Sequence, residues 1–139
     1  MNILVIDAQG GGIGKQLISA IRKEVPSAYI MAVGSNSMAT MNMLKAGPDE
    51  AATGENPVVV ACRKADIIVG PVGIVIADSM LGEITPKMAS VISQSRAKRI
   101  LIPFNLCGNV LVGISKMSIS ALVQAAVEEI KAGKAACED

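Results

Sequence analysis

Four glycines and a lysine are clustered near the start of the chain, at Gly10, Gly11, Gly12, Gly14 and Lys15. Glycine adopts positive φ angles and lets backbone N–H groups approach a ligand with no Cβ in the way. A helix that starts in such a turn presents unpaired N–H groups and the positive end of its dipole, which suits a phosphate. We therefore expect the N–H groups of residues 10–15 to converge on an anion, with a nucleotide phosphate as the leading hypothesis.

The position of Lys15 supports this hypothesis. It falls in the first turn of the predicted helix, where a cation costs about 0.3–1 kcal/mol against the helix dipole. The sequence places no Asp or Glu in that turn, so a bound anion would remove the penalty. The alternative is that Lys15 points into solvent and the glycines only form a tight turn.

The glycine segment departs from the common phosphate-binding motifs. The G-x-x-x-x-G-K-[ST] loop needs glycine and a hydroxyl residue where this chain has Gln9 and Gln16. Coordination of Mg²⁺ by a loop hydroxyl is then missing, and hydrolysis of a nucleoside triphosphate is not expected. A G-x-G-x-x-G motif starting at Gly10 fails at Lys15.

The loop of short-chain dehydrogenases fits only in part. Gly12 to Gly14 match it, but Asp7 and Ala8 replace its threonine and first glycine. Those enzymes also use a Y-x-x-x-K pair, which is absent because Tyr29 is the only tyrosine and no lysine follows four residues later.

Small polar residues follow the second predicted strand. An NAD site usually offers an acidic residue to the ribose at this point, whereas this chain has Ser35 and Asn36. These side chains could contact a ribose or a 2′-phosphate, so the ligand class stays NAD(P) or another nucleotide. An ordinary capped helix start explains them equally well.

Other polar or glycine residues follow the remaining strands and could line the same crevice. Asp7 and Asn105 would lie at its floor, and Gly70 and Gly73 could let the backbone pack against a ring or sugar, or merely turn the chain. Carboxylates at Asp7, Asp78 and Glu83 could bind Mg²⁺ or exchange protons, although each alone is more typical of a cap or turn. The loop at residues 53–56 and Ser79 lie near the same edge. The candidate ligand-binding residues are Asp7, Gln9, Gly10, Gly11, Gly12, Gly14, Lys15, Ser35, Asn36, Gly70, Gly73 and Asn105.

The composition excludes several classes of protein. With no histidine, catalysis by Ser–His or Cys–His pairs and metal binding by histidine are excluded. The three cysteines form no C-x-x-C pair, so neither a zinc site nor a thioredoxin-type motif is predicted. A net charge of +1 and 1% aromatic residues argue against nucleic-acid binding. The hydrophobic fraction of 51% predicts a homo-oligomer. No apolar run is long enough to span a membrane and no basic segment precedes the first strand, so we expect a cytoplasmic protein.

Apolar runs alternate with helical patterns along the chain. Runs at residues 2–7, 28–33, 50–53, 67–69 and 99–103 predict strands, and those at 13–25, 36–46, 86–95 and 119–130 predict helices. Continuous rather than alternating apolar runs indicate a parallel sheet covered on both faces. The predicted fold is α/β, a three-layer, doubly wound, mostly parallel and Rossmann-like sheet in a single domain at residues 1–133, with a flexible tail at 134–139.

Three segments are harder to interpret. Residues 58–65 follow an Asn-Pro helix-start signal at Asn56, but three consecutive valines favour a strand, so both interpretations stay open. Residues 73–81 are apolar and predict a helix. Residues 110–114 predict an edge strand.

Three long segments carry a family resemblance. Residues 5–16, 52–56 and 65–85, which include the glycine turn, resemble a family of small bacterial proteins of unknown function. The resemblance extends over nearly the whole chain. It implies a single-domain cytosolic bacterial protein with a Rossmann-like fold, and it supplies no activity or site residue.

The leading hypothesis is a protein that binds a nucleotide or a phosphorylated metabolite through the glycine turn. The alternative is a non-catalytic regulatory or assembly subunit that forms homo-oligomers. A third hypothesis is a small enzyme that uses carboxylates alone.

Overall fold

The computed structural model describes residues 1–104 and 106–133. Asn105, Cys137 and the predicted tail at 134–139 lie outside the described residues. Within the described residues, five strands form one parallel sheet in the order β3-β2-β1-β4-β5. The elements in chain order are β1 (Asn2–Asp7), α1 (Gly12–Glu24), β2 (Tyr29–Gly34), α2 (Ser37–Leu44), β3 (Glu50–Thr53), α3 (Glu55–Cys62), β4 (Ile67–Pro71), the 3₁₀ turn η1 (Val72–Val75), α4 (Pro86–Gln94), β5 (Lys98–Ile102) and α5 (Ile119–Lys131).

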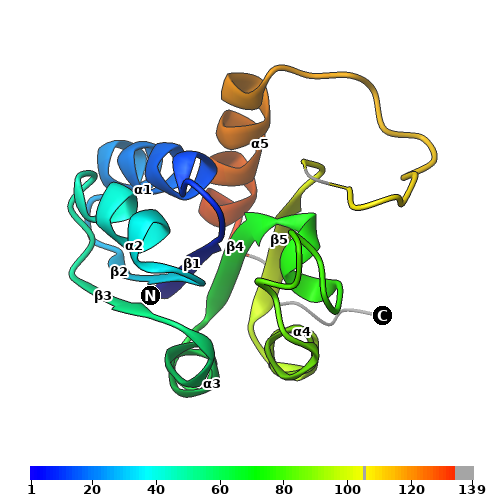
Figure 1. Cartoon of the computed structure of the whole chain (residues 1–139). Coiled ribbons are helices and arrows are strands. Elements are labelled where there is room, and N and C mark those ends of the chain that lie inside the picture. The colour runs from blue at the N-terminus through cyan, green and yellow to red at the C-terminus, as the bar shows by residue number, and fades with distance from the viewer. Residues whose placement is uncertain (105, 134–139) are drawn as a thin grey trace.

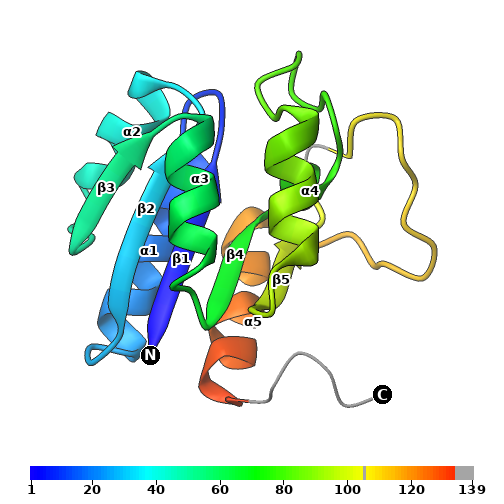
Figure 2. The same cartoon turned by 90° about the horizontal axis from the view of Figure 1, so that it is seen from below.

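Helices cover both faces of the sheet. α1, α2 and α5 lie on one face, and α3 and α4 lie on the other (Figures 1 and 2). Each face of the sheet packs against its helices in a separate hydrophobic core. Strand β1 contributes Ile3 and Val5 to the core beneath α1 and α5, and Leu4 and Ile6 to the core beneath α3 and α4. All four side chains are fully buried, which is why this strand is a continuous apolar run. The predicted three-layer, doubly wound, Rossmann-like fold is confirmed.

Helix starts follow the sequence signals closely. The side chains of Asn36, Thr85 and Ser118 accept hydrogen bonds from the backbone N–H groups three residues later, at 2.9, 3.1 and 3.1 Å. These bonds satisfy N–H groups that have no partner within the first helical turn. Of the two caps considered for α2, Asn36 rather than Ser35 takes the role.

Residues 58–65 resolve in favour of the helix. α3 begins at Glu55 with Gly54 as its N-cap, two residues before the predicted cap at Asn56, and it ends at Cys62 instead of residue 65. Val58 is buried while Val60 is exposed, because side chains two residues apart in a helix point in different directions and only one of them faces the sheet. The crossover from β3 to β4 requires a helix on this face, and this requirement overrides the strand preference of valine.

The predicted helix at residues 73–81 is wrong. Only the short 3₁₀ turn η1 forms there, and Asp78, Met80 and Leu81 have positive φ angles of 62°, 55° and 58°. Such angles are incompatible with a right-handed helix. The Asp78 N–H donates instead to the carbonyl of Ile84 at 2.8 Å, which folds the segment into a compact loop.

The predicted edge strand at residues 110–114 is also wrong. In the part of the chain that the structure describes, this segment belongs to no sheet, and it connects β5 to α5 as an exposed excursion (Figure 1). A strand needs a neighbour with which to pair, and the segment leaves the body before it meets one.

Candidate functional site

The glycine turn lies at the carboxyl end of β1, beside the point between β1 and β4 where the strand order reverses. Ligands of doubly wound sheets bind in this position. A hollow of about 190 Å³ lies against the turn. Its lining consists of Asp7, Ala8, Gln9, Gly10, Gly11, Gly12, Ile13, Gln16, Phe104 and Ile119.

The glycines of the turn have two different structural roles. A Cβ on Gly11 would lie 2.6 Å from the carbonyl oxygen of Ala39, and one on Gly14 would lie 2.5 Å from the sulfur of Met43. Gly11 also has a positive φ of 70°. These two glycines are therefore needed so that α1 can pack against α2.

Gly10 and Gly12 have no such constraint. Neither has a positive φ, and an added Cβ would meet no atom within 4 Å at either position. Both residues are exposed and both line the hollow. Neither the backbone conformation nor the packing of the described residues explains why these positions are glycine.

Asp7 caps helix α1 from the end of the preceding strand. Its carboxylate accepts hydrogen bonds from the N–H groups of Ala8 at 2.8 Å and Gly14 at 2.7 Å, and the residue is only 4% exposed. Burial raises the pKa of Asp7, the N–H groups of Gly14 and Ala8 oppose this, and the charge of Glu83 adds to the rise. The pKa lies above its ordinary value as a result.

The Asp7 carboxylate already supplies a negative charge near Lys15. The first turn of α1 contains no acidic residue, as predicted, but the carboxylate of Asp7 reaches it from outside the helix. This negative charge offsets the unfavourable position of Lys15 without any ligand. Fewer N–H groups are available to an anion than the sequence predicts. The N–H of Gly14 donates to Asp7, and that of Lys15 donates to the Gly11 carbonyl.

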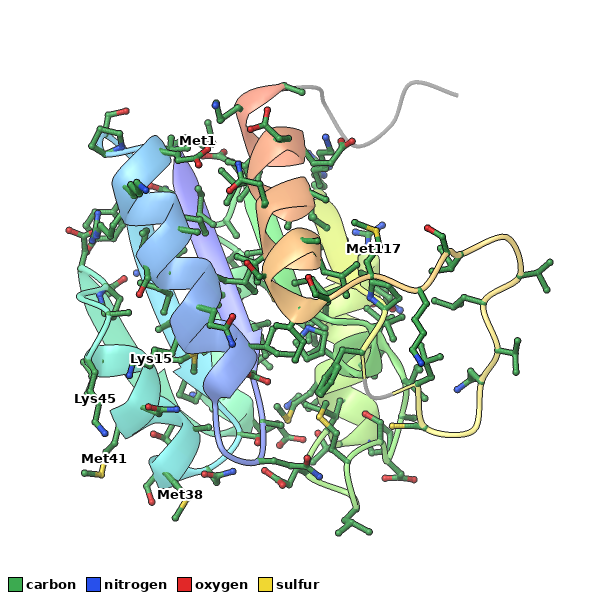
Figure 3. The ribbon with its side chains drawn as sticks, turned by 90° about the horizontal axis from the view of Figure 1, so that it is seen from above. Met1, Lys15, Met38, Met41, Lys45 and Met117 are labelled. Carbon is green, nitrogen blue, oxygen red and sulfur yellow. The ribbon has the colours of Figure 1, made fainter. Side chains whose placement is uncertain are left out.

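Lys15 lies on the outer surface of α1, on the side nearer α2 (Figure 3). It lines a separate hollow of about 590 Å³ together with Ser19, Lys23 and Asn42. The two hollows share Gly12 and Gln16 along their rims. The structure thus brings Lys15 near the turn but does not place it in the hollow that the turn lines.

Glu83 holds the turn in place from the far end of the chain. One oxygen of its carboxylate accepts hydrogen bonds from the Gln9 N–H at 3.0 Å, the Ser35 hydroxyl at 2.7 Å and the Asn36 amide at 2.6 Å. Burial alone would raise the pKa of Glu83, but these three hydrogen bonds outweigh it and the pKa is lowered. Glu83 is the residue whose central position the sequence did not reveal, because its partners are 47 to 74 positions away.

Ser35 and Asn36 are fully engaged within the protein. The Asn36 amide also donates to the carbonyl of Gln9 at 3.0 Å, and its oxygen caps α2. Neither residue lines the hollow beside the turn. Their observed part is to connect the end of β2 to the glycine turn and to Glu83.

Gly70 and Gly73 have structural roles at the carboxyl end of β4 and in the turn that follows it. A Cβ on Gly70 would overlap the carbonyl oxygen of Ile6, so glycine is required for β4 to lie close to β1. The carbonyl of Gly73 accepts a hydrogen bond from the buried Ser79 hydroxyl. The sequence left open whether these glycines contact a ligand or only turn the chain. The observed contacts explain both glycines by the turn and by strand packing.

The remaining strand-end residues are dispersed. The hydroxyl of Thr53 is 2.7 Å from that of Thr40, and Glu55 accepts a hydrogen bond from Thr85 at 2.7 Å. Asp78 is exposed in its loop. Among residues 1–104 and 106–133, no group of three Cys, Asp or Glu residues is arranged to hold a metal ion.

The fold and the position of the turn define a Rossmann-like α/β protein with a glycine-lined hollow at its topological switch point. The chain belongs to the family described as Domain of unknown function (DUF3842), whose model matches residues 2–135. The predicted membership of an uncharacterised family is thereby confirmed. No curated protein matches the chain.

Similar solved structures include the crystal structure of a dodecameric FMN-dependent UbiX-like decarboxylase from Escherichia coli O157:H7. The two proteins are 16% identical, and the match covers 94% of this chain and 76% of that chain with a TM-score of 0.49. Within the described residues, no helix combines the length and apolar character that a membrane span requires.

Proposed function

We propose that this protein binds a small phosphorylated ligand, a nucleotide or a phosphorylated metabolite, with the phosphate at the N–H groups of Gly10 and Gly12. The observation that carries the proposal is the pair of glycines whose missing side chains nothing in the described protein requires. A ligand that approaches the backbone closely accounts for glycine at both positions.

The hydrogen bonds of the turn support these two positions over their neighbours. The N–H groups of Gln9, Gly11 and Gly14 donate to Glu83, Ala8 and Asp7, respectively. Among the described residues, none accepts a hydrogen bond from the N–H groups of Gly10 or Gly12. Two N–H groups without an acceptor therefore remain at the helix start, on residues that line the hollow, and helix starts are where other proteins bind phosphate.

The size of the hollow favours a compact group. At about 190 Å³ it is smaller than the 300–1,000 Å³ of typical ligand pockets, so it suits a phosphate with its adjoining sugar. Phe104 and Ile119 supply the apolar wall opposite the turn. The remainder of NAD(P) or another nucleotide would extend beyond the rim.

The surrounding polar residues then have different roles in binding the ligand. Lys15 lines the neighbouring hollow, which shares Gly12 and Gln16 with the hollow at the turn, and it supplies the countercharge from there. Ser35 and Asn36 do not contact the ligand directly. They donate hydrogen bonds to Glu83, which in turn fixes the position of the glycine turn. Asp7 fixes the start of α1, so that the N–H groups face the ligand without reorganisation.

The test is thermal unfolding of the purified protein with matched pairs of ligands. AMP against adenosine, ribose 5-phosphate against ribose, FMN against riboflavin and NADP⁺ against NAD⁺ separate the phosphate from the rest of each molecule. We expect at least one phosphorylated member to raise Tm while its partner lacking that phosphate does not. Native mass spectrometry of the freshly isolated protein checks for a retained ligand.

Two variants locate the binding. Gly10→Ala and Gly12→Ala fill the space above the two N–H groups and are expected to abolish the ligand-dependent rise in Tm. Ser90→Ala, on the exposed side of α4 across the sheet, is the control and should respond as the wild type does. A panel without any shift, or a full shift in both glycine variants, contradicts the proposal.

A further inference from the structure

An exposed apolar arm connects β5 to α5. We define the arm as residues 109–117, which leave the body of the protein and return at Ser118 (Figures 1 and 2). Val110, Val112 and Ile114 are 84%, 95% and 55% exposed, and Leu111 and Met117 are exposed as well. An arm of this kind exposes apolar area that its own chain does not cover.

The arm has the sequence pattern of a strand. Val110, Val112 and Ile114 alternate, so in an extended conformation they share one face. Valine and isoleucine favour strands, and the same pattern predicts a strand from the sequence. No strand of the described chain pairs with the arm, so it has the character of a strand that lacks its neighbour.

The free edge of β3 offers what the arm lacks. β3 pairs with β2 on one side only, and its central residues, Ala51 and Ala52, carry no charge. A hollow of about 280 Å³ lies beside it, between the edge of the sheet and α3. The lining is mostly apolar and consists of Met31, Ala32, Val33, Glu50, Ala51, Ala52, Asn56, Pro57, Val60, Ala61 and Lys64.

The opposite edge of the sheet is less suitable. β5 begins with Lys98 and Arg99, and charged residues on an edge strand disfavour pairing with another chain. Lys98 also forms an ion pair with Glu129 of α5. The β3 edge carries one charged residue, Glu50 at its start, against two in β5, so it is the better acceptor of an added strand.

We propose that the arm of one copy of this chain docks on the β3 edge of a second copy as an added strand, with Val110, Val112 and Ile114 against the hollow. Addition of an extended segment to a sheet edge is a common mode of recognition, in which backbone hydrogen bonds and alternate side chains both contribute. The arm lies by β5 and the hollow by β3, at opposite edges of the sheet, so the two surfaces do not meet within one chain (Figure 1).

The apolar area of the arm matches a contact of modest size. Burial of one large apolar side chain removes roughly 60–120 Å² from water. The three side chains that share a face bring roughly 180–360 Å², and a similar area is covered on the second copy, so the backbone hydrogen bonds of the added strand must supply part of the stability. Lys116 is the only charged residue of the arm, and Glu50 at the rim of the hollow can pair with it.

Each copy has one arm and one acceptor edge. The contact is therefore head-to-tail, and it closes into a ring when the rotation between neighbours permits. This arrangement predicts a behaviour that a symmetric dimer through β3 alone cannot show, namely that two defective variants complement each other.

The experiment uses sedimentation velocity on the full chain. Val112→Asp places a charge on the arm, and Val60→Asp places one in the hollow. Leu81→Asp is the matched control, because Leu81 is 99% exposed but belongs to neither surface. Wild type and the control are expected to form the same oligomer, and each of the other two variants is expected to be monomeric.

Mixing the two defective variants gives the decisive result. Val112→Asp retains an intact hollow and Val60→Asp retains an intact arm, so an equimolar mixture should form a 1:1 dimer and nothing larger. Circular dichroism verifies that both variants are folded, and Val60→Lys replaces Val60→Asp if the latter unfolds, because its aliphatic stem tolerates an apolar setting.

Three results would overturn the proposal. They are a monomeric wild type at the highest concentration reached, an unchanged oligomer in Val112→Asp, and the absence of a dimer in the mixture of two folded variants. The first or second outcome leaves the proposal on phosphate binding untouched, since no residue of the arm or of the β3 hollow lines the hollow at the glycine turn.

Discussion

The Asp7 carboxylate accepts a 2.7 Å hydrogen bond from the Gly14 N–H, so the strand that leads into the glycine turn also caps the helix that leaves it. The same carboxylate accepts from Ala8 at 2.8 Å. A helix start that a glycine turn would leave open to an anion is thus partly closed by the protein itself. Among the described residues, the N–H groups of Gly10 and Gly12 keep no acceptor, and these are the groups that we propose for the phosphate.

Removal of the Asp7 side chain is expected to destabilise the fold. Asp7→Ala leaves two buried N–H groups without acceptors and should lower the free energy of unfolding by about 1–3 kcal/mol. Asp7→Asn, which keeps one acceptor, should fall between this variant and the wild type. The measurement is urea unfolding followed by circular dichroism.

Asp66 supplies the matched control for Asp7. Its carboxylate accepts a hydrogen bond of the same 2.7 Å length from the Asn2 N–H, but at an exposed site. Water replaces that bond, so Asp66→Ala should lower the unfolding free energy by no more than about 0.5 kcal/mol. Equal losses at both positions would show that burial of the cap has no importance.

The two kinds of glycine should respond differently to alanine. Gly14→Ala forces a Cβ to within 2.5 Å of the Met43 sulfur, and the resulting overpacking should cost about 1–3 kcal/mol. Gly12→Ala meets no atom within 4 Å and should change the stability of the ligand-free protein by less than about 0.5 kcal/mol. Thermal unfolding of both variants without ligand tests this contrast, and a large loss in Gly12→Ala would contradict it.

Glu83 should stabilise the protein in a pH-dependent manner. Its pKa is lowered in the folded state, so its contribution is fully present above the ordinary glutamate value of 4.5 and is lost as the pH falls through the folded-state pKa. Glu83→Gln should therefore cost roughly 1 kcal/mol at neutral pH, a figure limited by partial exposure, and progressively less under acid conditions. Urea unfolding of both proteins across this pH range is the measurement. A difference that does not change with pH would show that the charge of Glu83 plays no part.

Cys62 should be inert toward thiol reagents in the native protein. Burial raises the pKa of its thiol to about 11, so at pH 8 only about one molecule in a thousand carries the reactive thiolate. In a variant with serine at the other two cysteines, reaction with Ellman's reagent should be at least about a hundredfold slower in buffer than in urea, because unfolding restores an ordinary pKa near 8.5. Rapid reaction of the native variant would show that α3 opens readily at this end.

Much of the fold follows from local patterns. The strand at residues 2–7 appears with the predicted bounds, because burial on both faces imposes an apolar run that few other structures require. The short edge strand at 50–53, which has no fully buried residue, also has the predicted bounds. The predicted helix starts at residues 86 and 119 are correct, because the caps that fix them, Thr85 and Ser118, act within one turn. The errors at 73–81 and 110–114 have the opposite cause, since in both segments an apolar pattern was compatible with several partners.

The candidate site was predictable only in outline. Its position follows from the glycine turn and the strand order, but the network around Glu83 joins residues from three distant parts of the chain. No spacing in the sequence marks that network. The separate role of each glycine is likewise invisible in the sequence, because it depends on Ala39 and Met43 of a neighbouring helix.

The sequence by itself determined the layers of this protein, its parallel strands and the turn that faces the switch point, because apolar periodicity and glycine act through neighbouring residues. Only the tertiary structure decided which N–H groups of that turn stay open, because the carboxylates of Asp7 and Glu83 accept from Ala8, Gln9 and Gly14. It also decided that the arm after β5 stays without a strand partner, since strand pairing depends on contacts between distant segments that the local pattern does not specify.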